Sequence, residues 1–537
     1  MSGAAVYLKH NIIAEPLFNQ WHAWSYLIPP AQAALFIANS HLKMMRSFVS
    51  APEVHVAALK NPAMQGGAFI NHPASKVAEI KELMNWTTDE CASMLELADA
   101  IKTLDTMVQA QANGTSLEPL YREVPAALRG YVELTYDIDN HPAVRFIEAL
   151  LYRSRFYRPD LQSIALFADS GERPFAFNTP KLRDDQTLHV RKPFASTELD
   201  EFFKTKYRPR AFGEIKEMLG VSDKDESLLS SFFTSEPEPA GRRFDSSGVR
   251  VRYFGHACVL IESRKVNVLL DPVISYKSDG GIARYTYADL PDRIDYALIT
   301  HTHQDHCMLE SLLQLRHKIG TIVVPRSNSG SLADPSMKLM LKQIGFSDVR
   351  ELDDLETIEV DGGYILGVPF LGEHGDLNIR TKAAYLVKLE NRSVVCVADS
   401  NNLEPRLYEH VHELVGDIDV LFIGMECDGA PLSWVYGPLL TKPLARKMDQ
   451  TRRLDGSNCE KGLNLVDSLK PKQVYVYAMG QEPWLTYLTN IQYTDESRPI
   501  VESNKLVNEC LSSSRVSERL FGCKEILLEP VTASAKA

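Results

Sequence analysis

The sequence predicts an α/β protein made of two unlike parts, and three observations support this. The chain has 537 residues, which is too long for a single hydrophobic core. Residues 234–247 are rich in Pro, Glu, Gly and Ser and poor in apolar side chains, as linkers are. The pattern before this stretch is mixed and often helical, and short β-rich runs dominate after it. We therefore expect an N-terminal α+β domain over residues 1–240 and a second domain over residues 248–530.

The second part alternates short β-rich runs with helical stretches, which predicts a two-sheet core flanked by helices. The predicted strands are residues 249–262, 266–270, 294–300, 321–324, 364–370, 383–389, 393–398, 420–424 and 473–478. The predicted helices are residues 308–318, 403–414 and 459–469. In the first part, Thr87 and Glu90 have the spacing of an N-terminal capping box, and apolar residues follow at helical spacing, so we expect a helix to begin there.

Composition and charge limit the classes of partner. A net charge of −12 argues against nucleic-acid binding. The eight cysteines include no CxxC pair, which favours a reducing compartment and excludes a zinc knuckle. No signal peptide is evident, and no apolar run is long enough to span a bilayer. We expect a cytoplasmic protein with no membrane partner.

The most informative segment is the loop that follows the predicted strand 294–300. It reads His301-x-His303-x-Asp305-His306 and places three imidazoles and a carboxylate within six positions. One metal ion can take the first two histidines, and a second can take Asp305 and His306. A polar loop that merely happens to be rich in histidine is less plausible, because buried unpaired imidazoles this close would repel or stay unsatisfied. The spacing therefore predicts a binuclear metal site.

Three further acidic residues follow apolar runs. Glu373 comes after the strand ending at residue 370, Asp399 ends the strand 393–398, and Asp271 ends the strand 266–270. Side chains in these positions can converge at one edge of a sheet.

These motifs resemble those of the metallo-β-lactamase superfamily over residues 249–527. The resemblance implies an αββα sandwich in which His301 and His303 bind one metal and Asp305 and His306 the other. It also implies that Asp399 bridges the two ions and that Asp271 holds a ligand by a hydrogen bond.

Two departures bear on the activity. The hydrolases of this superfamily usually have a histidine where Glu373 stands, with His374 only second, and they have a final histidine that is absent here, since no His follows His412. Three imidazoles and three carboxylates suit iron or manganese better than zinc. We therefore favour an oxygenase, and a zinc-dependent hydrolase acting on a lactone, thioester or phosphodiester remains the alternative. His374 remains an alternative ligand to Glu373.

Both departures, the large N-terminal domain and the GEHGDL and MGQEPW segments resemble the CmlA-type diiron β-hydroxylases of nonribosomal peptide pathways, over nearly the whole chain. The resemblance implies a non-haem diiron monooxygenase of antibiotic biosynthesis. Its substrate would be an amino acid held as a thioester on a carrier (thiolation) domain and hydroxylated at the β-carbon. It assigns His301, His303 and Glu373 to one iron, Asp305 and His306 to the other, and Asp399 to both. Besides these ligands we expect no catalytic residue.

The resemblance also implies O2 as co-substrate and a homodimer. The chain has no GxGxxG fingerprint and no ferredoxin-type cysteine cluster, so electrons would come from an external reductase. We expect the N-terminal domain to serve as a cover, a dimerisation element or a docking site for the carrier.

Several other positions admit two interpretations. We expect His256 to be a hydrogen-bonded core histidine rather than a ligand. Glu426 can line the pocket or cap a loop.

Two basic groups can dock an acidic carrier, although a solvated helix face or internal salt bridges explain them equally well. They are Arg153, Arg155 and Arg158, and Lys204, Lys206, Arg208 and Arg210. Three aromatic residues can wall the substrate cavity or belong to the core, namely Trp434, Tyr436 and Trp484.

Overall fold

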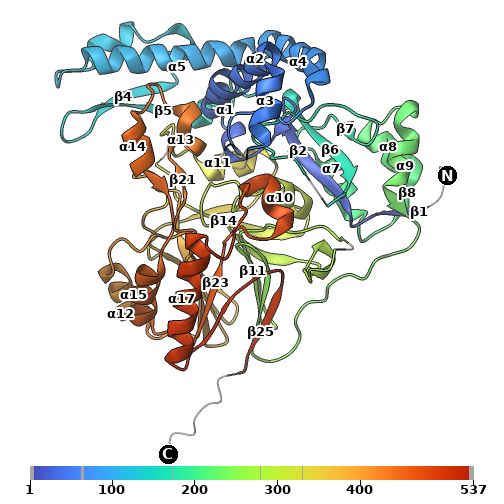
Figure 1. Cartoon of the computed structure of the whole chain (residues 1–537), viewed down its shortest axis with the longest axis vertical. Coiled ribbons are helices and arrows are strands. Elements are labelled where there is room, and N and C mark those ends of the chain that lie inside the picture. The colour runs from blue at the N-terminus through green and yellow to red at the C-terminus, as the bar shows by residue number, and fades with distance from the viewer. Residues whose placement is uncertain are drawn as a thin grey trace, which may run out of the picture.

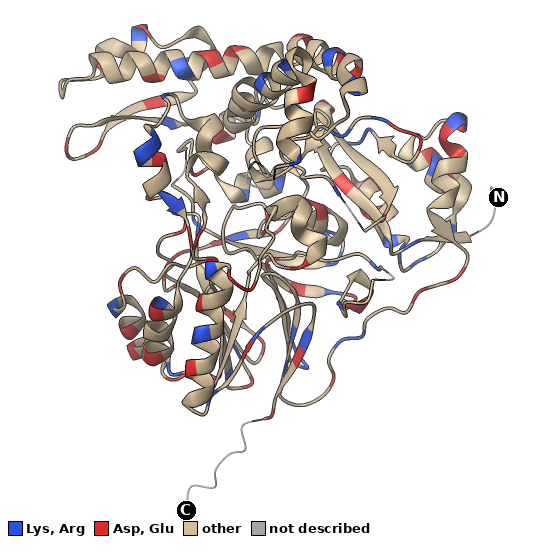
Figure 2. Ribbon diagram, viewed as in Figure 1, with Lys and Arg blue, Asp and Glu red and all other residues tan. Residues whose placement is uncertain are grey.

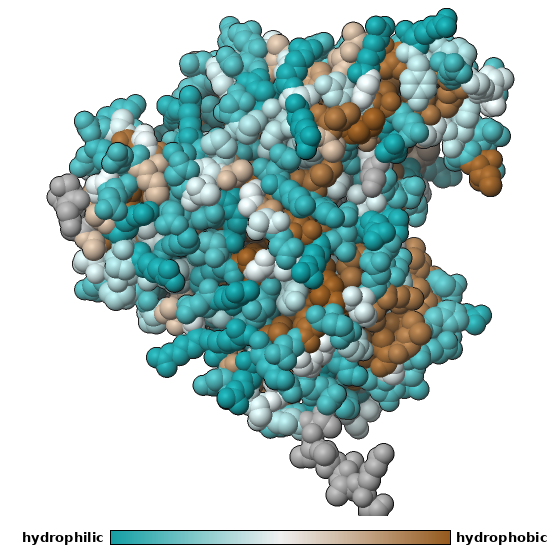
Figure 3. Space-filling view, turned by 180° about the vertical axis from the view of Figure 1, so that it is seen from behind, coloured by the Kyte–Doolittle hydropathy of each residue, from teal (hydrophilic) through white to brown (hydrophobic). Residues whose placement is uncertain are grey.

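The computed structural model describes residues 5–61, 64, 66–171, 173–278, 280–328 and 330–530. The chain folds into an N-terminal part, coloured blue to green, that lies against one side of a larger second part (Figure 1). The rear surface is mainly hydrophilic, with scattered apolar patches (Figure 3).

Two seven-stranded sheets form the second part. The first has the order β15-β14-β13-β12-β11-β10-β25, and the second β16-β17-β18-β19-β20-β23-β24. The strands of the first are β10 (Val249–Gly255), β11 (Cys258–Glu262), β12 (Asn267–Leu270), β13 (Ile294–Leu298), β14 (Ile319–Pro325), β15 (Val349–Leu352) and β25 (Lys524–Leu528). Those of the second are β16 (Thr357–Val360), β17 (Gly363–Val368), β18 (Ala384–Leu389), β19 (Arg392–Cys396), β20 (Val420–Gly424), β23 (Gln473–Tyr477) and β24 (Val516–Arg519).

The two sheets pack face to face over an apolar core that includes Val251, Ile261, Tyr385 and Phe422. The outer face of the second sheet packs on α12 (Arg406–Val415), α15 (Cys459–Leu469) and α17 (Arg498–Ser512) through a separate apolar cluster. The other face of the first sheet carries α10 (Leu309–Leu315) and α11 (Met337–Gln343). These layers are the αββα sandwich that the sequence predicted.

The N-terminal part continues the outer layer over the first sheet. Its four-stranded sheet has the order β3-β2-β6-β7, and one apolar cluster joins it to α10 and α11. The elements are β2 (Ile12–Phe18), β3 (Trp21–His22), β6 (Gln162–Ala168), β7 (Leu188–Val190), α1 (Pro30–Phe36), α2 (Leu42–Ser50), α4 (Val77–Glu90), α5 (Ala92–Gln111) and α7 (Thr197–Lys204). A π-helical turn, η2 (Ile37–His41), joins α1 to α2.

The domain limits at residues 240 and 248 remain our proposal. Residues 237–244 have no regular secondary structure, and they run from β9 (Phe233–Thr234), in the N-terminal part, toward β10. Residues 1–4 of the proposed first domain lie outside the described residues.

The predicted start of a helix at Thr87 is wrong. Thr87 lies inside α4, where its Oγ1 donates a hydrogen bond to the Leu83 carbonyl (2.7 Å) and accepts one from Asn19 Nδ2 (3.0 Å). The residues at helical spacing belong instead to α5, which begins at Ala92 after a break at Cys91. The single run predicted over residues 249–262 is a hairpin of two strands, β10 and β11.

Candidate metal centre

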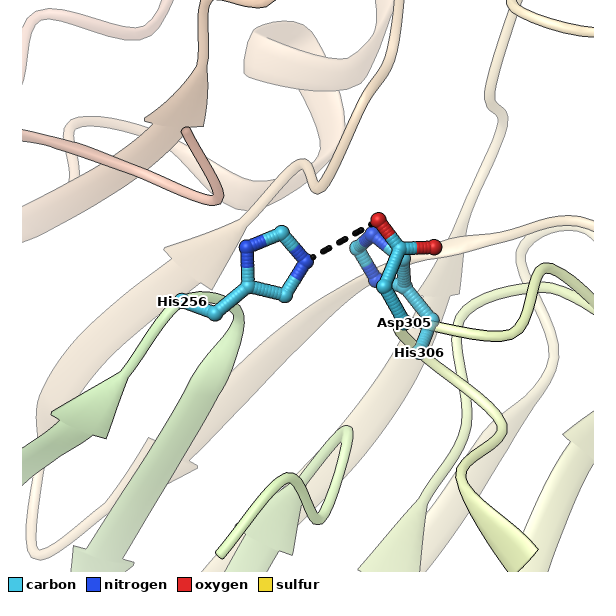
Figure 4. Close-up of side chains that lie close together, drawn as sticks. All are labelled: His256, Asp305 and His306. Carbon is cyan, nitrogen blue, oxygen red and sulfur yellow. Dashed lines mark ion pairs between the residues drawn. The ribbon is translucent and has the colours of Figure 1, made fainter. Parts of the chain in front are cut away.

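The polar residues of the predicted metal site all emerge at one edge of the two sheets. The loop after β13 carries the histidine motif, and β17, β19 and β12 lead to Glu373, Asp399 and Asp271. The β10–β11 hairpin contributes His256 from the side, and its ring points toward Asp305 and His306 (Figure 4).

His301, His303 and Glu373 form one group that could hold a metal ion, with one potential ligand atom from each within 4.8 Å of the others. His303 Nδ1 lies 2.5 Å from Glu373 Oε1, and His301 Nε2 lies 3.9 Å from Glu373 Oε2. All three side chains are buried. His374 is not part of this group, although its Nδ1 lies 3.0 Å from Glu373 Oε2.

A second group shares His301 and adds His306 and Asp399. His306 Nε2 lies 3.1 Å from Asp399 Oδ2, and His301 Nε2 lies 4.0 Å from the same oxygen. His301 and Asp399 therefore lie between the two ends of the site.

The third group consists of His256, Asp305 and His306. His256 Nε2 lies 3.2 Å from Asp305 Oδ2, and its Nδ1 accepts a hydrogen bond from the Gly480 N–H (3.1 Å). His256 is thus buried and hydrogen-bonded, as expected, but it also belongs to the immediate surroundings of the metal motif. The sequence feature that could have indicated this location is the position of His256 in a tight turn between two apolar runs.

Two outer contacts orient the histidines. Asp271 Oδ2 lies 2.8 Å from His306 Nδ1, which confirms the hydrogen bond expected of this aspartate. The Tyr436 hydroxyl lies 3.0 Å from His303 Nε2 and 2.9 Å from His374 Nδ1. In His306 and His303 the contact fixes one ring nitrogen and leaves the other directed at Asp399 and Glu373, respectively. In His374 the same nitrogen, Nδ1, faces both the Tyr436 hydroxyl and Glu373.

The backbone around the site is strained. Five non-glycine residues that follow strands near the site have positive φ: Asp271 (38°), His256 (49°), Glu373 (69°), Ala398 (47°) and Ala478 (53°). Such conformations cost free energy and persist only where the surrounding structure enforces them, which is typical of functional sites. Gly372 beside Glu373 is required as glycine, since a Cβ there would lie 2.4 Å from Asn401 Cβ.

The charges in the site reinforce one another. Burial opposes protonation of His306, yet Asp399 and Asp271 raise its pKa well above the usual value. Burial likewise opposes ionisation of Glu373, but His303 and His374 lower its pKa well below the usual value. Glu373 is therefore held as a carboxylate, which is the form that binds a cation.

The donor set fits a pair of iron ions. His301 Nε2, Glu373 Oε2 and Asp399 Oδ1 are buried and have no hydrogen-bond partner among the described residues. Buried polar atoms without a hydrogen-bond partner cost free energy unless a ligand satisfies them. These three atoms belong to a set of imidazoles and carboxylates, and such a set suits iron.

Two cavities adjoin the site. The inner one, of about 260 Å³, is lined by His303, Asp305, Glu373 and Asp399. The outer one, of about 750 Å³, lies between the N-terminal part and residues 433–449. Both are lined by Gly66, Gln304, Trp434 and Val435, so they meet there.

Of the other residues singled out in the sequence, some line the two cavities and others lie away from them. Glu426 both lines the inner cavity and caps a loop, since it accepts a hydrogen bond from the Gly429 N–H (2.5 Å), and burial raises its pKa to about 7. Trp434 lines both cavities, whereas Trp484 lines neither and stacks with Arg284 elsewhere.

Most of the basic residues considered for docking are engaged within the chain. Their partners are Arg155–Glu96, Arg158–Asp160, Lys204–Glu201, Lys206–Gln314 and Arg210–Glu214. Internal pairing is therefore the better interpretation of both groups.

The αββα fold and the grouped ligands define a binuclear metalloenzyme. Residues 7–237 match the family described as the diiron non-heme beta-hydroxylase N-terminal domain, and residues 250–439 match the beta-lactamase superfamily domain. The 4-amino-L-phenylalanyl-[CmlP-peptidyl-carrier-protein] 3-hydroxylase of Streptomyces venezuelae is 40% identical over 524 residues, which are 96% of this chain and 98% of that protein.

Solved structures agree with the sequence comparisons. The crystal structure of CmlA, a diiron beta-hydroxylase from Streptomyces venezuelae, superposes with a TM-score of 0.92 at 38% identity and covers 98% of this chain and all of that one. A point mutant of CmlA gives a TM-score of 0.90 at 38% identity, covering 97% of this chain and all of that one.

The chain belongs to the CmlA-type family of non-haem diiron β-hydroxylases. It is an oxygen-dependent enzyme whose cofactor is a pair of iron ions. Among the described residues, no helix is both long and apolar enough to cross a membrane.

Proposed function

We propose that the protein hydroxylates the β-carbon of an amino acid bound as a thioester to the carrier domain of a nonribosomal peptide synthetase. The observation that carries this proposal is the 40% identity, over nearly the full length of both chains, to a hydroxylase named for an aminoacyl carrier protein. The two adjoining cavities support it, because a tethered substrate needs a passage from the surface to the metal site.

We also propose a role for each residue of the site. His301, His303 and Glu373 would hold one iron, Asp305 and His306 the other, and Asp399 both. The first of the three structural groups corresponds to the first iron, and the position of Asp399 between the two ends of the site supports a bridge.

His256 fits a positioning role better than ligation. Because the Gly480 N–H donates to His256 Nδ1, the ring proton of the neutral imidazole is on Nε2. That N–H faces Asp305 Oδ2 and would hold this carboxylate in place.

The iron pair, when bound, supplies activation of O2 for insertion of one oxygen atom into a C–H bond. The reaction consumes the substrate, O2, two electrons and two protons, and it yields the alcohol and water. The chain's own contribution is to orient its ligands through Asp271 and Tyr436 and to hold the tethered carbon in a narrow cavity. We propose a separate reductase as the source of electrons and a homodimer as the oligomeric state.

The decisive experiment is mass spectrometry of an aminoacyl carrier domain after turnover with the iron-loaded enzyme, a reductant and O2. We expect a mass gain of one oxygen atom on the amino acid, and 4-amino-L-phenylalanine is the first substrate to test. Elemental analysis should find about two irons per chain. Zinc in the purified protein together with thioester hydrolysis would instead favour a hydrolase.

A further inference from the structure

The outer cavity opens at a boundary between the two parts of the chain. Most residues that line it are buried or half-buried, but Lys43 on α2, Ala68 and Pro443 are exposed. These three residues mark the mouth of the cavity. One side of the mouth is therefore formed by the N-terminal part and the other by the segment that contains Pro443.

That segment belongs to an excursion, residues 430–454, that is closed at its base by pairing of β21 (Ala430–Pro431) with β22 (Arg453–Leu454). Near its base, Trp434 lines both cavities. Just before β22 the chain forms α14 (Arg446–Thr451), which lies between the N-terminal part and the body of the second part (Figure 1).

Exposed basic residues lie on both segments that form the mouth, in a protein whose net charge is −12. Lysine and arginine colour much of α14 in Figure 2. On one side lie Lys43 and Arg46, and on the other Lys442, Arg446 and Lys447; all five are exposed. No ion pair within the described part of the chain engages any of the five, in contrast to the basic groups near residues 155 and 206.

The one acidic residue of α14, Asp449, forms no ion pair with these cations among the described residues. Asp449 lines the cavity, and its carboxylate accepts hydrogen bonds from the backbone N–H and the hydroxyl of Ser433 (2.8 Å each). Next to it, Met448 is 51% exposed and adds an apolar contact to the basic surface.

We propose that Lys43, Arg46, Lys442, Arg446 and Lys447, with Met448, form the docking surface for the carrier domain. This inference rests on the proposed function and names where that partner binds. Carrier domains are usually acidic, and every loaded carrier bears the phosphodiester of its phosphopantetheine arm beside the docking face. Exposed cations on the two segments that form the mouth complement both charges, and the arm enters the outer cavity and reaches the metal site where the cavities meet.

The test is the affinity of the full-length, iron-loaded enzyme for a nonribosomal carrier domain loaded with 4-amino-L-phenylalanine. In the double variant Arg446→Glu with Lys447→Glu, the Kd should rise about tenfold, since like charges replace complementary ones at the interface. The wild-type Kd should also rise with ionic strength. The matched control is Lys224→Glu with Lys342→Glu, two exposed lysines away from both cavities, with the same change in net charge.

The outcomes separate the docking surface from the proposed function. An unchanged Kd in the α14 variant, or an equal rise in the control, overturns the docking surface even if hydroxylation occurs. Tight carrier binding by the wild type without any hydroxylated product overturns the proposed function alone. A wild type that does not bind the loaded carrier overturns both. An unchanged unfolding temperature in each variant shows that the substitutions did not disturb the fold.

Discussion

Asp271 Oδ2 lies 2.8 Å from His306 Nδ1, and the opposite nitrogen of that ring lies 3.1 Å from Asp399. Asp271 is itself held by the residue just before the motif, because the Thr300 N–H and hydroxyl donate to its two oxygens (2.8 and 2.7 Å). Thr300 thus orients Asp271, and Asp271, 35 positions upstream of His306, orients the last histidine of the motif.

Substitution Asp271→Asn should therefore weaken iron binding. The amide oxygen can accept one of the two Thr300 hydrogen bonds, but the amide nitrogen cannot accept the other, and the charge that favours the required orientation of His306 is lost. Loss of such an outer partner typically costs about 10–100-fold in metal affinity or activity. Iron per chain and hydroxylation rate are the measurements, and the exposed Asp245→Asn is the control. Full iron content and activity in Asp271→Asn would show that this contact is dispensable.

The pair Glu373→Ala and His374→Gln distinguishes the two possible ligands at this loop. Glu373→Ala should abolish hydroxylation and lower the iron content without unfolding the protein, because His303 Nδ1 and His301 Nε2 lose the carboxylate between them. His374→Gln should keep both irons, since its amide can replace the contact with the Tyr436 hydroxyl. Iron loss in His374→Gln together with an active Glu373→Ala would reverse the assignment.

Much of this site could be predicted from the sequence because its spacing is local. The histidine motif occupies six positions in one loop, and the structure brings those side chains together as expected. Glu373, Asp399 and Asp271 were identifiable because each follows an apolar run, and strand ends that meet at one edge of a sheet bring such residues together.

The rest depends on contacts that no local pattern reveals. His256 approaches Asp305 only because the β10–β11 hairpin turns at the same edge of the sandwich. Tyr436 lies 133 residues from His303 and reaches it through the excursion over residues 430–454. The strands β15, β16, β24 and β25 were missed because they are four or five residues long and only partly buried, so their apolar signal is weak.

The Thr87 error has a similar cause. A Thr with a Glu three residues on does resemble a capping box, but α4 and α5 are nearly continuous there. Its hydroxyl bonds the Leu83 carbonyl one turn back, which a threonine inside a helix can do. The same hydroxyl accepts a tertiary hydrogen bond from Asn19, in the turn between β2 and β3, so it is not available to cap a helix.

Arg173 ties the two parts of the chain together, and its removal should be strongly destabilising. Its guanidinium pairs with Glu15 (3.3 Å) on β2 and with Glu310 (2.9 Å) on α10, and it lies 3.5 Å above the Tyr487 ring. Arg173→Met leaves two buried carboxylates without this partner, which costs about 3–5 kcal/mol for a buried pair.

Denaturant unfolding of the Arg173→Met variant measures this loss. The control is Arg155→Met, which breaks an exposed pair with Glu96 and should cost about 1 kcal/mol or less. Equal losses in the two variants would mean that Arg173 acts only as a surface residue.

Glu148 predicts a pH dependence of stability that is separate from the metal site. This residue begins α6 (Glu148–Leu151), its Oε2 accepts a hydrogen bond from the Ser336 N–H (2.9 Å), and its Oε1 has no partner among the described residues. Burial raises the pKa of its carboxyl to about 7, from an ordinary value of 4.5.

Between pH 4.5 and about 7 the folded state therefore binds more protons at Glu148 than the unfolded state does. The contribution of Glu148 is most favourable below pH 4.5 and is lost as the pH rises through 7, by at most about 3 kcal/mol. Glu148→Gln keeps an acceptor for Ser336 and removes the titration. As the pH rises through this window, the free energy of unfolding of the variant should therefore increase relative to that of the wild type. Above pH 7 the variant should remain the more stable of the two. Parallel curves for the two proteins from pH 4.5 to 8 would show that Glu148 titrates normally in the folded state.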